Sequence, residues 1–370
     1  MNTIRAPEDD PLTPIDPPTP TPAEHFAPAL LSWHAVHGRH DLPWQQDRSP
    51  YRVWVSEIML QQTQVSTVIG YFERFMARFP DPDPLAAASV DEVLHLWTGL
   101  GYYARGRNLH RAAVRIREQF GGVFPTRFEA VEGLPGIGRS TAGAILALSQ
   151  GQRFPILDGN VRRVLSRWFG IAGDPADRAT TALLWARADD CTPHREVATY
   201  TQAIMDLGAT LCTRRNPLCM HCPVAEGCVA RETGRQHALP APKARRAGRP
   251  ARRTHMVLAR RPDGSVFLRQ RPPAGIWGGL WAAPAFDSAE EARSFAAQLV
   301  GAQPQPQELP SIAHAFTHFD LTITPWLVRC EGFGAVMDAP DSLWYNARQP
   351  ARIGLPAPVK SLLERIDKEY

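Results

Sequence analysis

Apolar side chains recur at intervals of three and four residues through most of the first 230 positions of the chain. One set comprises Val65, Val68, Ile69, Phe72, Phe75 and Met76, and a second comprises Leu109, Ala112, Ala113 and Ile116. Residues with this spacing lie on one face of an α-helix, where they pack against other helices. The pattern therefore predicts an all-α domain over residues 26–233.

The pattern changes after residue 253. HMVLARR and VFLRQRP flank a PDGS turn, and FDLTITPWLV alternates apolar and polar residues. Alternation with period two predicts β-strands, and Asp263-Gly264 predicts that the first two form a hairpin. SAEEARSFAAQLV, which lies between the hairpin and the last strand, predicts a helix that begins after Ser288. Residues 254–370 are thus expected to form a small α+β domain.

Two segments lack either pattern. Residues 1–25 are rich in Pro, Thr and acids, and such a composition buries too little apolar surface to offset the entropy of ordering, so a disordered tail is expected. Residues 234–253, GRQHALPAPKARRAGRPARR, combine Pro and Gly with many basic residues and predict an interdomain linker.

Composition limits the class of protein. A chain of 370 residues with 44% hydrophobic content can bury two ordinary cores. No run approaches the ~20 apolar residues that a membrane-spanning helix needs, and the start has acids and prolines where a secretion signal has an apolar segment. We therefore expect a soluble cytoplasmic protein, in which clustered cysteines are metal ligands rather than disulfides. The formal net charge of +4 is only weak evidence for a polyanionic partner.

Four cysteines lie in one short loop, CTRRNPLCMHCPVAEGC, with the spacing Cys-x6-Cys-x2-Cys-x5-Cys. Structural zinc usually takes paired Cys-x2-Cys knuckles, whereas iron–sulfur cages accept less regular spacings. Spacing alone therefore supports a cluster and zinc about equally. Arg214 and Arg215 would present rigid cations to phosphates, although a merely solvated loop has the same charges. The predicted metal ligands are Cys212, Cys219, Cys222 and Cys228, and Cys191 and Cys330 are predicted to be packing residues.

The segment LPGIGRSTAGAILAL, residues 134–148, combines a glycine-containing turn with the start of a helix. Gly136 and Gly138 allow the backbone to approach another surface closely, and the unpaired N–H groups of a helix N-terminus suit a DNA phosphate. An ordinary turn between two helices gives the same pattern.

Two carboxylates stand out. Glu57 lies among apolar residues in a helix that begins at Ser49-Pro50 and ends near Gln61. Apolar surroundings would raise its pKa and keep it protonated, as a general acid requires, although a Glu on the polar face of a helix also fits. Asp158, in FPILDGNVRRVL, is placed as a helix N-cap, where backbone N–H groups and the helix dipole would lower its pKa. Such a pair can cleave a glycosidic bond if the two acids meet in space.

Together these segments resemble the helix-hairpin-helix DNA glycosylase superfamily and, within it, the MutY family of adenine DNA glycosylases. The resemblance covers about residues 26–365 and is carried by DLPW, SEIMLQQTQV, GLGYYARGRNLH, LPGIGRSTAGA, LDGNVRRVLSR, MDLGATLCTRRNPLCMHCP, GIWGGLWAAP and HAFTHFDL. It implies a monomeric base-excision repair enzyme with a [4Fe–4S] cluster in the cysteine loop. The implied substrate is double-stranded DNA that contains adenine opposite 8-oxoguanine or guanine.

The resemblance also implies a role for each matched residue. Glu57 would protonate adenine at N7, Asp158 would stabilise the sugar cation, and Asn160 would orient Asp158 or the attacking water. Because the duplex stack hides the base, the adenine must be extruded, and Gln62 and Tyr102 would wedge into or fill the vacated position. The adenine pocket would be lined by Leu42, Trp44 and Gln202.

A lysine at one hairpin position distinguishes the related endonuclease III-like enzymes, in which its amine attacks the sugar. This chain has Ser140 there, so a monofunctional glycosylase is expected, with Ser140 at most supporting the site. Two alternatives are a bifunctional glycosylase/lyase for oxidised pyrimidines and a non-catalytic DNA-binding protein with structural zinc.

The second domain resembles the Nudix fold. Its helix carries Glu290 and Glu291 but lacks the Arg-Glu-x2-x-Glu-Glu pattern of the magnesium-binding hydrolases, so phosphoanhydride hydrolysis is not expected. By the resemblance, the loop Phe316, Thr317 and His318 would recognise 8-oxoguanine. Many family members have Ser at the middle position, and Thr317 keeps the hydroxyl but adds a methyl group.

Overall fold

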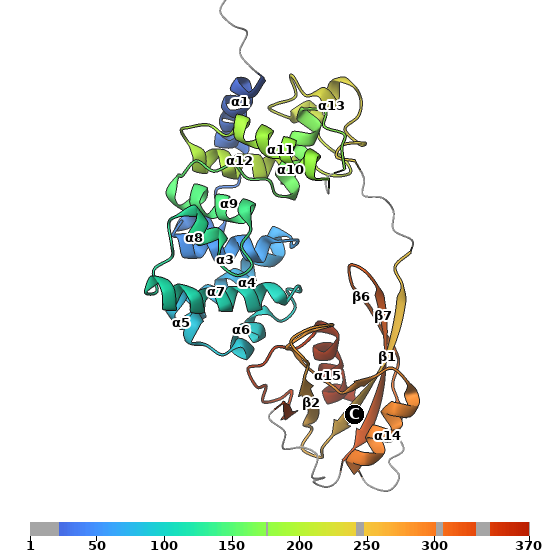
Figure 1. The fold of residues 1–370 in the computed structure, drawn as a ribbon. Helices are drawn as coiled ribbons and strands as arrows, with labels where there is room; N and C mark the ends of the chain where they lie inside the picture. The colour runs from blue at the N-terminus through green and yellow to red at the C-terminus, as the bar shows by residue number, and fades with distance from the viewer. Residues whose placement is uncertain (1–21, 175–176, 242–247, 301–305, 331–340, 370) are drawn as a thin grey trace, which may run out of the picture. The chain divides into compact units, whose positions relative to one another are not determined.

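The computed structural model describes residues 22–174, 177–241, 248–300, 306–330 and 341–369. The chain divides into two compact units, the first made of Met1–Arg39 and Leu157–Ala241 and the second of His40–Ile156 and Pro242–Tyr370. Figure 1 shows the helices and strands of both units. Each unit is described separately below, and the predicted domain boundaries remain a prediction.

The first unit is helical. Helices α10 and α11 begin at aspartate N-caps, because the Oδ1 of Asp158 accepts the Val161 N–H at 2.7 Å and the Oδ2 of Asp177 accepts the Thr180 N–H at 2.8 Å. Helix α12 packs on α1 and α10, and the Phe26 ring meets Trp168 edge to face at 4.9 Å. The elements are α1 (Pro22–His37), α10 (Gly159–Trp168), α11 (Arg178–Cys191), α12 (Val197–Thr210), η1 (Cys219–His221) and α13 (Val229–Glu232).

Helix α1 begins inside the segment that was expected to be a tail. Residues 22–25 of that segment are helical, and residues 1–21 lie outside the described residues. Proline at the first position of a helix costs no hydrogen bond, because the N–H of that position has no partner within the helix. Pro22 is therefore a suitable start for α1.

The helical part of the second unit has a core built from the two predicted apolar faces. Leu109, Ala112, Ala113 and Ile116 are all buried, as are Val68, Phe72, Phe75 and Met76. The helix expected to begin at Ser49-Pro50 does so, since the Ser49 Oγ accepts the Arg52 N–H at 3.4 Å. The elements are α2 (Pro43–Gln46), α3 (Pro50–Leu60), α4 (Val65–Arg78), α5 (Pro82–Ala87), α6 (Val90–Trp97), α7 (Ala104–Phe120), α8 (Phe128–Glu132) and α9 (Arg139–Gln150).

The rest of the second unit is a mixed sheet between two helices. The strand order is β3-β2-β1-β7-β5, with β4 paired to β1, β6 to β7 and β8 to β2, and the central pair β1 and β7 is parallel. The elements are β1 (Ala251–Arg260), β2 (Val266–Gln270), β3 (Trp281–Ala282), β4 (Ala285–Phe286), α14 (Ala289–Val300), β5 (Gln307–Glu308), β6 (Ile312–Ala315), β7 (Asp320–Arg329), β8 (Ser342–Tyr345) and α15 (Ala357–Glu369).

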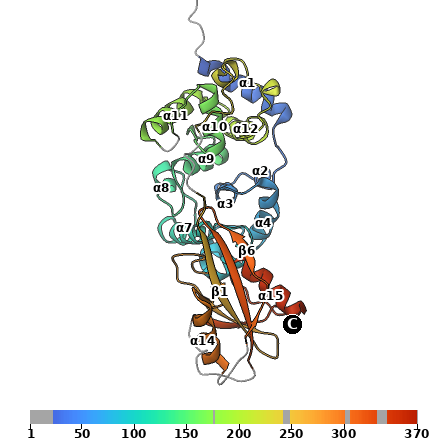
Figure 2. The same cartoon turned by 90° about the vertical axis from the view of Figure 1, so that its right-hand side faces the viewer.

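Alternation along β1 sends its side chains to two cores. Met256 and Leu258 join the core that α15 covers, whereas Val257 and Ala259 join the core that α14 covers. Figures 1 and 2 show these two helices on opposite sides of the sheet. The predicted hairpin, strand and helix are confirmed, with Gly264 at φ +86° in the hairpin turn and the Ser288 Oγ accepting the Glu291 N–H at 3.1 Å.

Strand β1 begins within the segment predicted as a linker. Residues 251–253 of that segment pair with residues 320–322 of β7, because the parallel register continues to the start of both strands. Residues 242–247 of the linker lie outside the described residues, and Leu239 is buried. Among the residues that the structure describes, no helix has the length and apolar character needed to cross a bilayer.

The sheet contacts helix α6 within the second unit. Leu94 of α6 belongs to the same core as Leu280, and the Trp281 Nε1–H donates to the Asp91 Oδ1 at 3.0 Å. Tyr103 Oη donates to the Leu355 carbonyl at 3.0 Å. The helices that carry the candidate DNA-contacting turns and the sheet are therefore packed together as one body in this unit.

Candidate active site and cysteine loop

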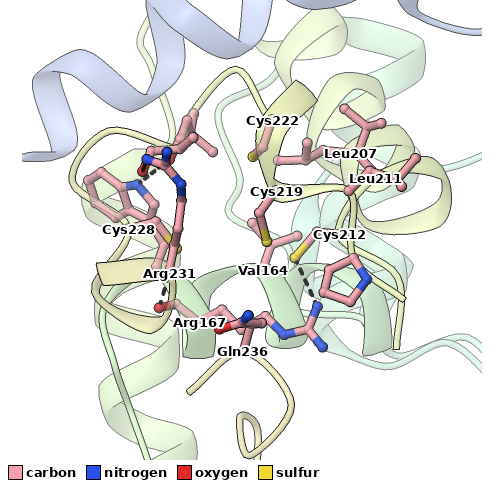
Figure 3. A pocket seen from close by; sticks show the side chains of 15 residues that line it. Val164, Arg167, Leu207, Leu211, Cys212, Cys219, Cys222, Cys228, Arg231 and Gln236 are labelled. Carbon is pink, nitrogen blue, oxygen red and sulfur yellow. Dashed lines mark hydrogen bonds between the residues drawn. The ribbon is translucent and has the colours of Figure 1, made fainter. Parts of the chain in front are cut away.

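The four clustered cysteines surround one pocket after helix α12. Cys212 follows the end of α12, Cys219 begins η1, Cys222 follows η1, and Cys228 is the N-cap of α13. Their side chains line a single cavity together with apolar groups such as Val164, Leu207 and Leu211 (Figure 3). Cys191 and Cys330 are buried elsewhere, as predicted for packing residues.

The four cysteines that line this cavity supply a donor set that suits zinc or an iron–sulfur cluster. Among the described residues, no group of three or more Cys, His, Asp or Glu side chains has the arrangement of a site for a single metal ion. A single zinc ion would draw four thiolates to about 2.3 Å from one point, whereas an iron–sulfur cluster takes its ligands at separate iron atoms. Burial raises the pKa of Cys222 to about 12, and it also raises the pKa of Cys228, so these thiols must lose protons when they bind metal.

Two arginines on α10 that were not among the predicted functional residues contact this loop. Arg167 is 3% exposed, and its Nη1 lies 3.3 Å from the Cys212 Sγ and donates to the Thr213 carbonyl at 2.8 Å. The Arg163 Nε donates to the Cys212 carbonyl at 2.7 Å. The signal was present in LDGNVRRVLSR, because positions four apart on a helix lie on the same face.

Arg163 also contacts Asn160, one of the candidate catalytic residues. Its Nη2 donates to the Asn160 Oδ1 at 2.8 Å and to the Gly208 carbonyl at 2.6 Å. The Asn160 Nδ2 lies 3.5 Å from the Asp158 Oδ2, so polar contacts run from Cys212 through Arg163 and Asn160 to Asp158. A Cβ on Gly208 would lie 2.6 Å from the Asn160 Cβ, which explains why glycine occupies this position.

The pKa of Asp158 is raised, which corrects the expectation that capping would lower it. The N-cap hydrogen bond is present, and it acts in the expected direction, as do Asn160 and Arg163. Burial of the carboxylate outweighs these contributions, because the protein removes the water that would stabilise its charge. The charged form of this carboxyl is therefore costly in free energy, and a nearby cation would stabilise it.

Glu57 lies in the last turn of α3. Its side chain is half-buried, and its two neighbours in the sequence, Ser56 and Ile58, are both buried. Helix α3 ends at Leu60, one residue before the predicted end near Gln61. Glu57 belongs to the second unit and Asp158 to the first, so their convergence on one substrate remains a prediction.

Gln62 and Tyr102 share an unusual backbone conformation. Their φ angles are +58° and +48°, in the left-handed region that non-glycine residues rarely adopt, and both side chains are exposed. Each lies in a turn before a helix, Gln62 before α4 and Tyr102 before α7. Tyr103 instead packs against the sheet core.

The three residues expected in the adenine pocket are all buried. Leu42 and Trp44 belong to the second unit, where Trp44 meets the Phe72 ring edge to face at 5.5 Å. Gln202 belongs to the first unit, and its Nε2 donates to the Asp206 Oδ1 at 2.9 Å. Whether they share one pocket thus remains a prediction.

The glycine-containing turn joins α8 to α9 as a hairpin of helices. Gly136 has φ +82°, and a Cβ there would lie 2.7 Å from the Asn108 Cβ. Gly138 is the N-cap of α9 and has no side chain to cap the helix, and Ser140 lies in its first turn. Arg214 and Arg215 are exposed in the cysteine loop.

The candidate lesion-recognition loop follows β6. The Phe316 ring stacks on Phe319 at 4.4 Å, whereas Thr317 and His318 are exposed. The Tyr102 Oη lies 3.4 Å from the Thr317 Oγ1. The second unit therefore brings together one residue from its helices and one from its sheet, each of which was predicted separately to contact DNA.

Three family models match the chain. They describe an HhH-GPD superfamily base excision DNA repair protein at residues 55–189, an iron–sulfur binding domain of endonuclease III at 212–228, and a NUDIX domain at 255–365. The chain is 37% identical over 344 residues to the adenine DNA glycosylase of Buchnera aphidicola subsp. Acyrthosiphon pisum (strain APS), covering 93% of this chain and 98% of the relative. The chain belongs to the adenine DNA glycosylase family.

Further similarities agree with membership in the adenine DNA glycosylase family. The chain is 34% identical to the adenine DNA glycosylase of Homo sapiens, over 85% of this chain and 69% of the human protein. A solved structure of a thermostable thymine-DNA glycosylase superposes with a TM-score of 0.53 at 25% identity, covering 57% of this chain and 97% of that one. The predicted fold class is confirmed, and the cysteine loop is an iron–sulfur binding domain of the endonuclease III type.

The cysteine loop yields a spectroscopic prediction. Cys219→Ser should abolish the broad visible absorption of an iron–sulfur cluster in the purified protein, because the four-thiolate shell loses a ligand. The matched control is Cys330→Ser, which changes a cysteine in the sheet core and should leave the absorption intact. A colourless wild-type protein that contains stoichiometric zinc would contradict the assignment.

Proposed function

We propose that this protein hydrolyses the N-glycosidic bond of adenine that lies opposite 8-oxoguanine or guanine in double-stranded DNA. The observation that carries the proposal is the partly buried carboxylate of Asp158, held by the N-cap hydrogen bond and by Asn160 next to Arg163. A desolvated anion placed in this way would stabilise an oxocarbenium-like sugar cation. Membership in the adenine DNA glycosylase family supports the choice of base.

Glu57 supplies the proton in this proposal. Protonation of adenine at N7 weakens the bond between C1′ and N9, and the leaving base then departs neutral. Glu57 lies in the last turn of α3, and the turn that follows this helix carries Gln62, the group proposed to enter the stack, which supports a joint role for the two residues. Leu42, Trp44 and Gln202 are proposed to enclose the extruded adenine.

Asp158 and Asn160 act on the sugar. The anionic carboxylate stabilises the cation that develops at C1′ or briefly traps it, and the Asn160 amide orients the carboxylate or the incoming water. The raised pKa of Asp158 supports this role, because a carboxylate that burial has deprived of water gains most from a cation that forms beside it.

The strand itself is left uncut. Lyase chemistry needs an amine nucleophile, and the hairpin position that would supply it is Ser140, in the first turn of α9. The second candidate, a bifunctional glycosylase/lyase on oxidised pyrimidines, is disfavoured for this reason. Efficient covalent capture of the wild-type protein on damaged duplex DNA by borohydride would favour it.

The loop at residues 316–318 reads the base opposite the adenine. Exposed Thr317 and His318 are available to contact 8-oxoguanine, and the contact between Thr317 and Tyr102 joins this loop to the turn proposed to enter the duplex. Gly136, Gly138, Arg214 and Arg215 would contact phosphates. Cys212, Cys219, Cys222 and Cys228 would hold the [4Fe–4S] cluster, whose proposed role is to fix this loop. The protein is expected to act as a monomer in the cytoplasm.

Substitution of the proposed acid tests the reaction. Glu57→Gln should lower single-turnover adenine release from an A:8-oxoguanine duplex by at least ~10²-fold, because general acid catalysis typically contributes that much. Cleavage of the product by alkali reveals the abasic sites, and duplex binding should change little. Glu73→Gln, an exposed glutamate on α4, is the control. Undiminished base release by Glu57→Gln would remove Glu57 from the mechanism.

The pH dependence tests the state of Asp158. If its anion is the active form, base release rises as pH increases through its pKa, which lies above the ordinary value for Asp. Asn160→Ala removes a hydrogen bond that lowers this pKa, so the acidic limb of the single-turnover pH–rate profile should move to higher pH. An acidic limb that stays in place or moves to lower pH would contradict the assignment.

The lesion-recognition role can be tested without deleting the sheet. Thr317→Val removes the hydroxyl but keeps the shape, and it should reduce the preference for A:8-oxoguanine over A:G by about three- to tenfold, the range expected for one hydrogen bond. Rates on the two duplexes provide the ratio. Thr322→Val on β7 is the matched control, and an unchanged ratio in Thr317→Val would argue against this loop.

A further inference from the structure

Two exposed side chains lie in strained turns that a single arginine joins. Gln62 and Tyr102 both have a positive φ without being glycine, and Tyr102 is 45% exposed. Such conformations persist only where the surroundings hold them. Arg105, in the first turn of α7, is 8% exposed and reaches both turns.

The Arg105 guanidinium donates hydrogen bonds to oxygen atoms at each of the two turns. The acceptors of Nη1 are the carbonyls of Ile58 at 3.0 Å and Met59 at 2.8 Å, at the end of α3, and that of Gln61 at 2.5 Å, in the first turn. The acceptors of Nη2 are the Thr63 Oγ1 at 3.1 Å and, from the second turn, the carbonyls of Leu100 at 3.5 Å and Gly101 at 3.3 Å.

The contacts bracket the two exposed residues. Gln61 and Thr63 are the immediate neighbours of Gln62, and Gly101 is the immediate neighbour of Tyr102. The Tyr102 carbonyl accepts the Arg105 N–H at 2.8 Å, and the guanidinium carbon lies 5.3 Å from the centre of the Tyr102 ring. The Arg105 side chain thus sets the position of the two turns relative to each other.

Arginine is the residue type that this arrangement requires. Its planar guanidinium presents several N–H donors in a fixed geometry, whereas lysine has one compact ammonium group that cannot reach acceptors on two turns at once. Trp97 supports the group, with its ring centre 5.6 Å from the guanidinium carbon and its Nε1–H donating to the Gly101 carbonyl at 3.1 Å. Burial lowers the pKa of Arg105 to about 10, so the side chain keeps its charge at neutral pH.

We propose that Arg105 is a positioning residue that holds the turns at 61–63 and 100–102 in one fixed relation, so that Gln62 and Tyr102 enter the duplex together. This inference rests on the proposed function, which assigns those two side chains to the opened base stack. Arg105 itself does not contact the reacting atoms. Its contribution is to fix the strained turns before DNA binds, so that less ordering is needed during base extrusion.

Arg105→Lys tests the proposal in the full-length protein, with Arg117→Lys, an exposed position further along α7, as the matched control. Two quantities are measured, single-turnover adenine release from an A:8-oxoguanine duplex and the fluorescence rise of 2-aminopurine placed at the adenine position, which reports unstacking. Arg105→Lys should slow both by at least tenfold, whereas Arg117→Lys should match the wild type.

A double-mutant cycle separates positioning from general stability. In a protein that already carries Gln62→Ala and Tyr102→Ala, Arg105→Lys should reduce the rate by less than threefold further, because the groups through which it acts are gone. An equal loss in both backgrounds would overturn the proposal, as would unstacking at the wild-type rate in Arg105→Lys.

Two further outcomes are decisive. If Arg105→Lys fails to fold, Thr63→Val removes one acceptor of the guanidinium beside Gln62, and it should slow unstacking in the wild-type background but not in the Gln62→Ala, Tyr102→Ala background. Unstacking at the wild-type rate in Thr63→Val would then overturn the proposal.

If the wild-type protein releases no adenine, the proposed function fails and this inference fails with it. If the wild-type protein releases adenine and Arg105→Lys is unaffected, the inference alone is overturned.

Discussion

Buried and half-buried guanidinium groups donate hydrogen bonds to carbonyls of the loops and turns that carry the candidate functional residues. Arg105 donates to the turns that carry Gln62 and Tyr102, and Arg163 and Arg167 donate to the start of the cysteine loop. A buried carbonyl without a donor is costly, so each of these loops would otherwise need water or a different path. Arginine suits the task because one side chain can serve several acceptors in fixed directions.

The same constraint couples parts that have different chemistry. Arg163 contacts the carbonyl of Cys212, a candidate cluster ligand, and the amide of Asn160, which lies next to Asp158. A displacement of the cysteine loop would therefore move Arg163 and Asn160 and change the surroundings of the Asp158 carboxylate. The iron–sulfur binding domain can thus contribute to the geometry of the candidate site without taking part in the reaction.

The sheet of the second unit contacts helix α6 and both tyrosines of the turn before α7. Asp91 of α6 accepts the Trp281 N–H, Tyr103 donates to Leu355, and Tyr102 contacts Thr317. The turn before α7 therefore presents Tyr103 to the sheet core and the preceding Tyr102 to solvent, beside the loop proposed to recognise the lesion. This arrangement gives a physical route by which recognition of one base can act on the turn proposed to enter the stack.

The sequence by itself determined which segments form helices or strands and which residues are candidates for function. Spacing of three and four residues predicted the buried faces of α4 and α7, and alternation with period two predicted β1, β2 and β7, because these periodicities follow directly from local backbone geometry. The cysteine spacing indicated a metal site, and the quoted motifs indicated the family. The N-cap role of Asp158 was also readable, because capping depends on the next three residues alone.

Only the tertiary structure decided what surrounds the candidate functional side chains. Local capping predicted a lowered pKa for Asp158, yet burial by distant parts of the fold raises it. Arg105 looked like any helical arginine, since its acceptors lie more than forty positions earlier in the chain or in an adjoining turn. Desolvation and long-range hydrogen bonds depend on which segments meet in space, and no local pattern in a sequence encodes that meeting.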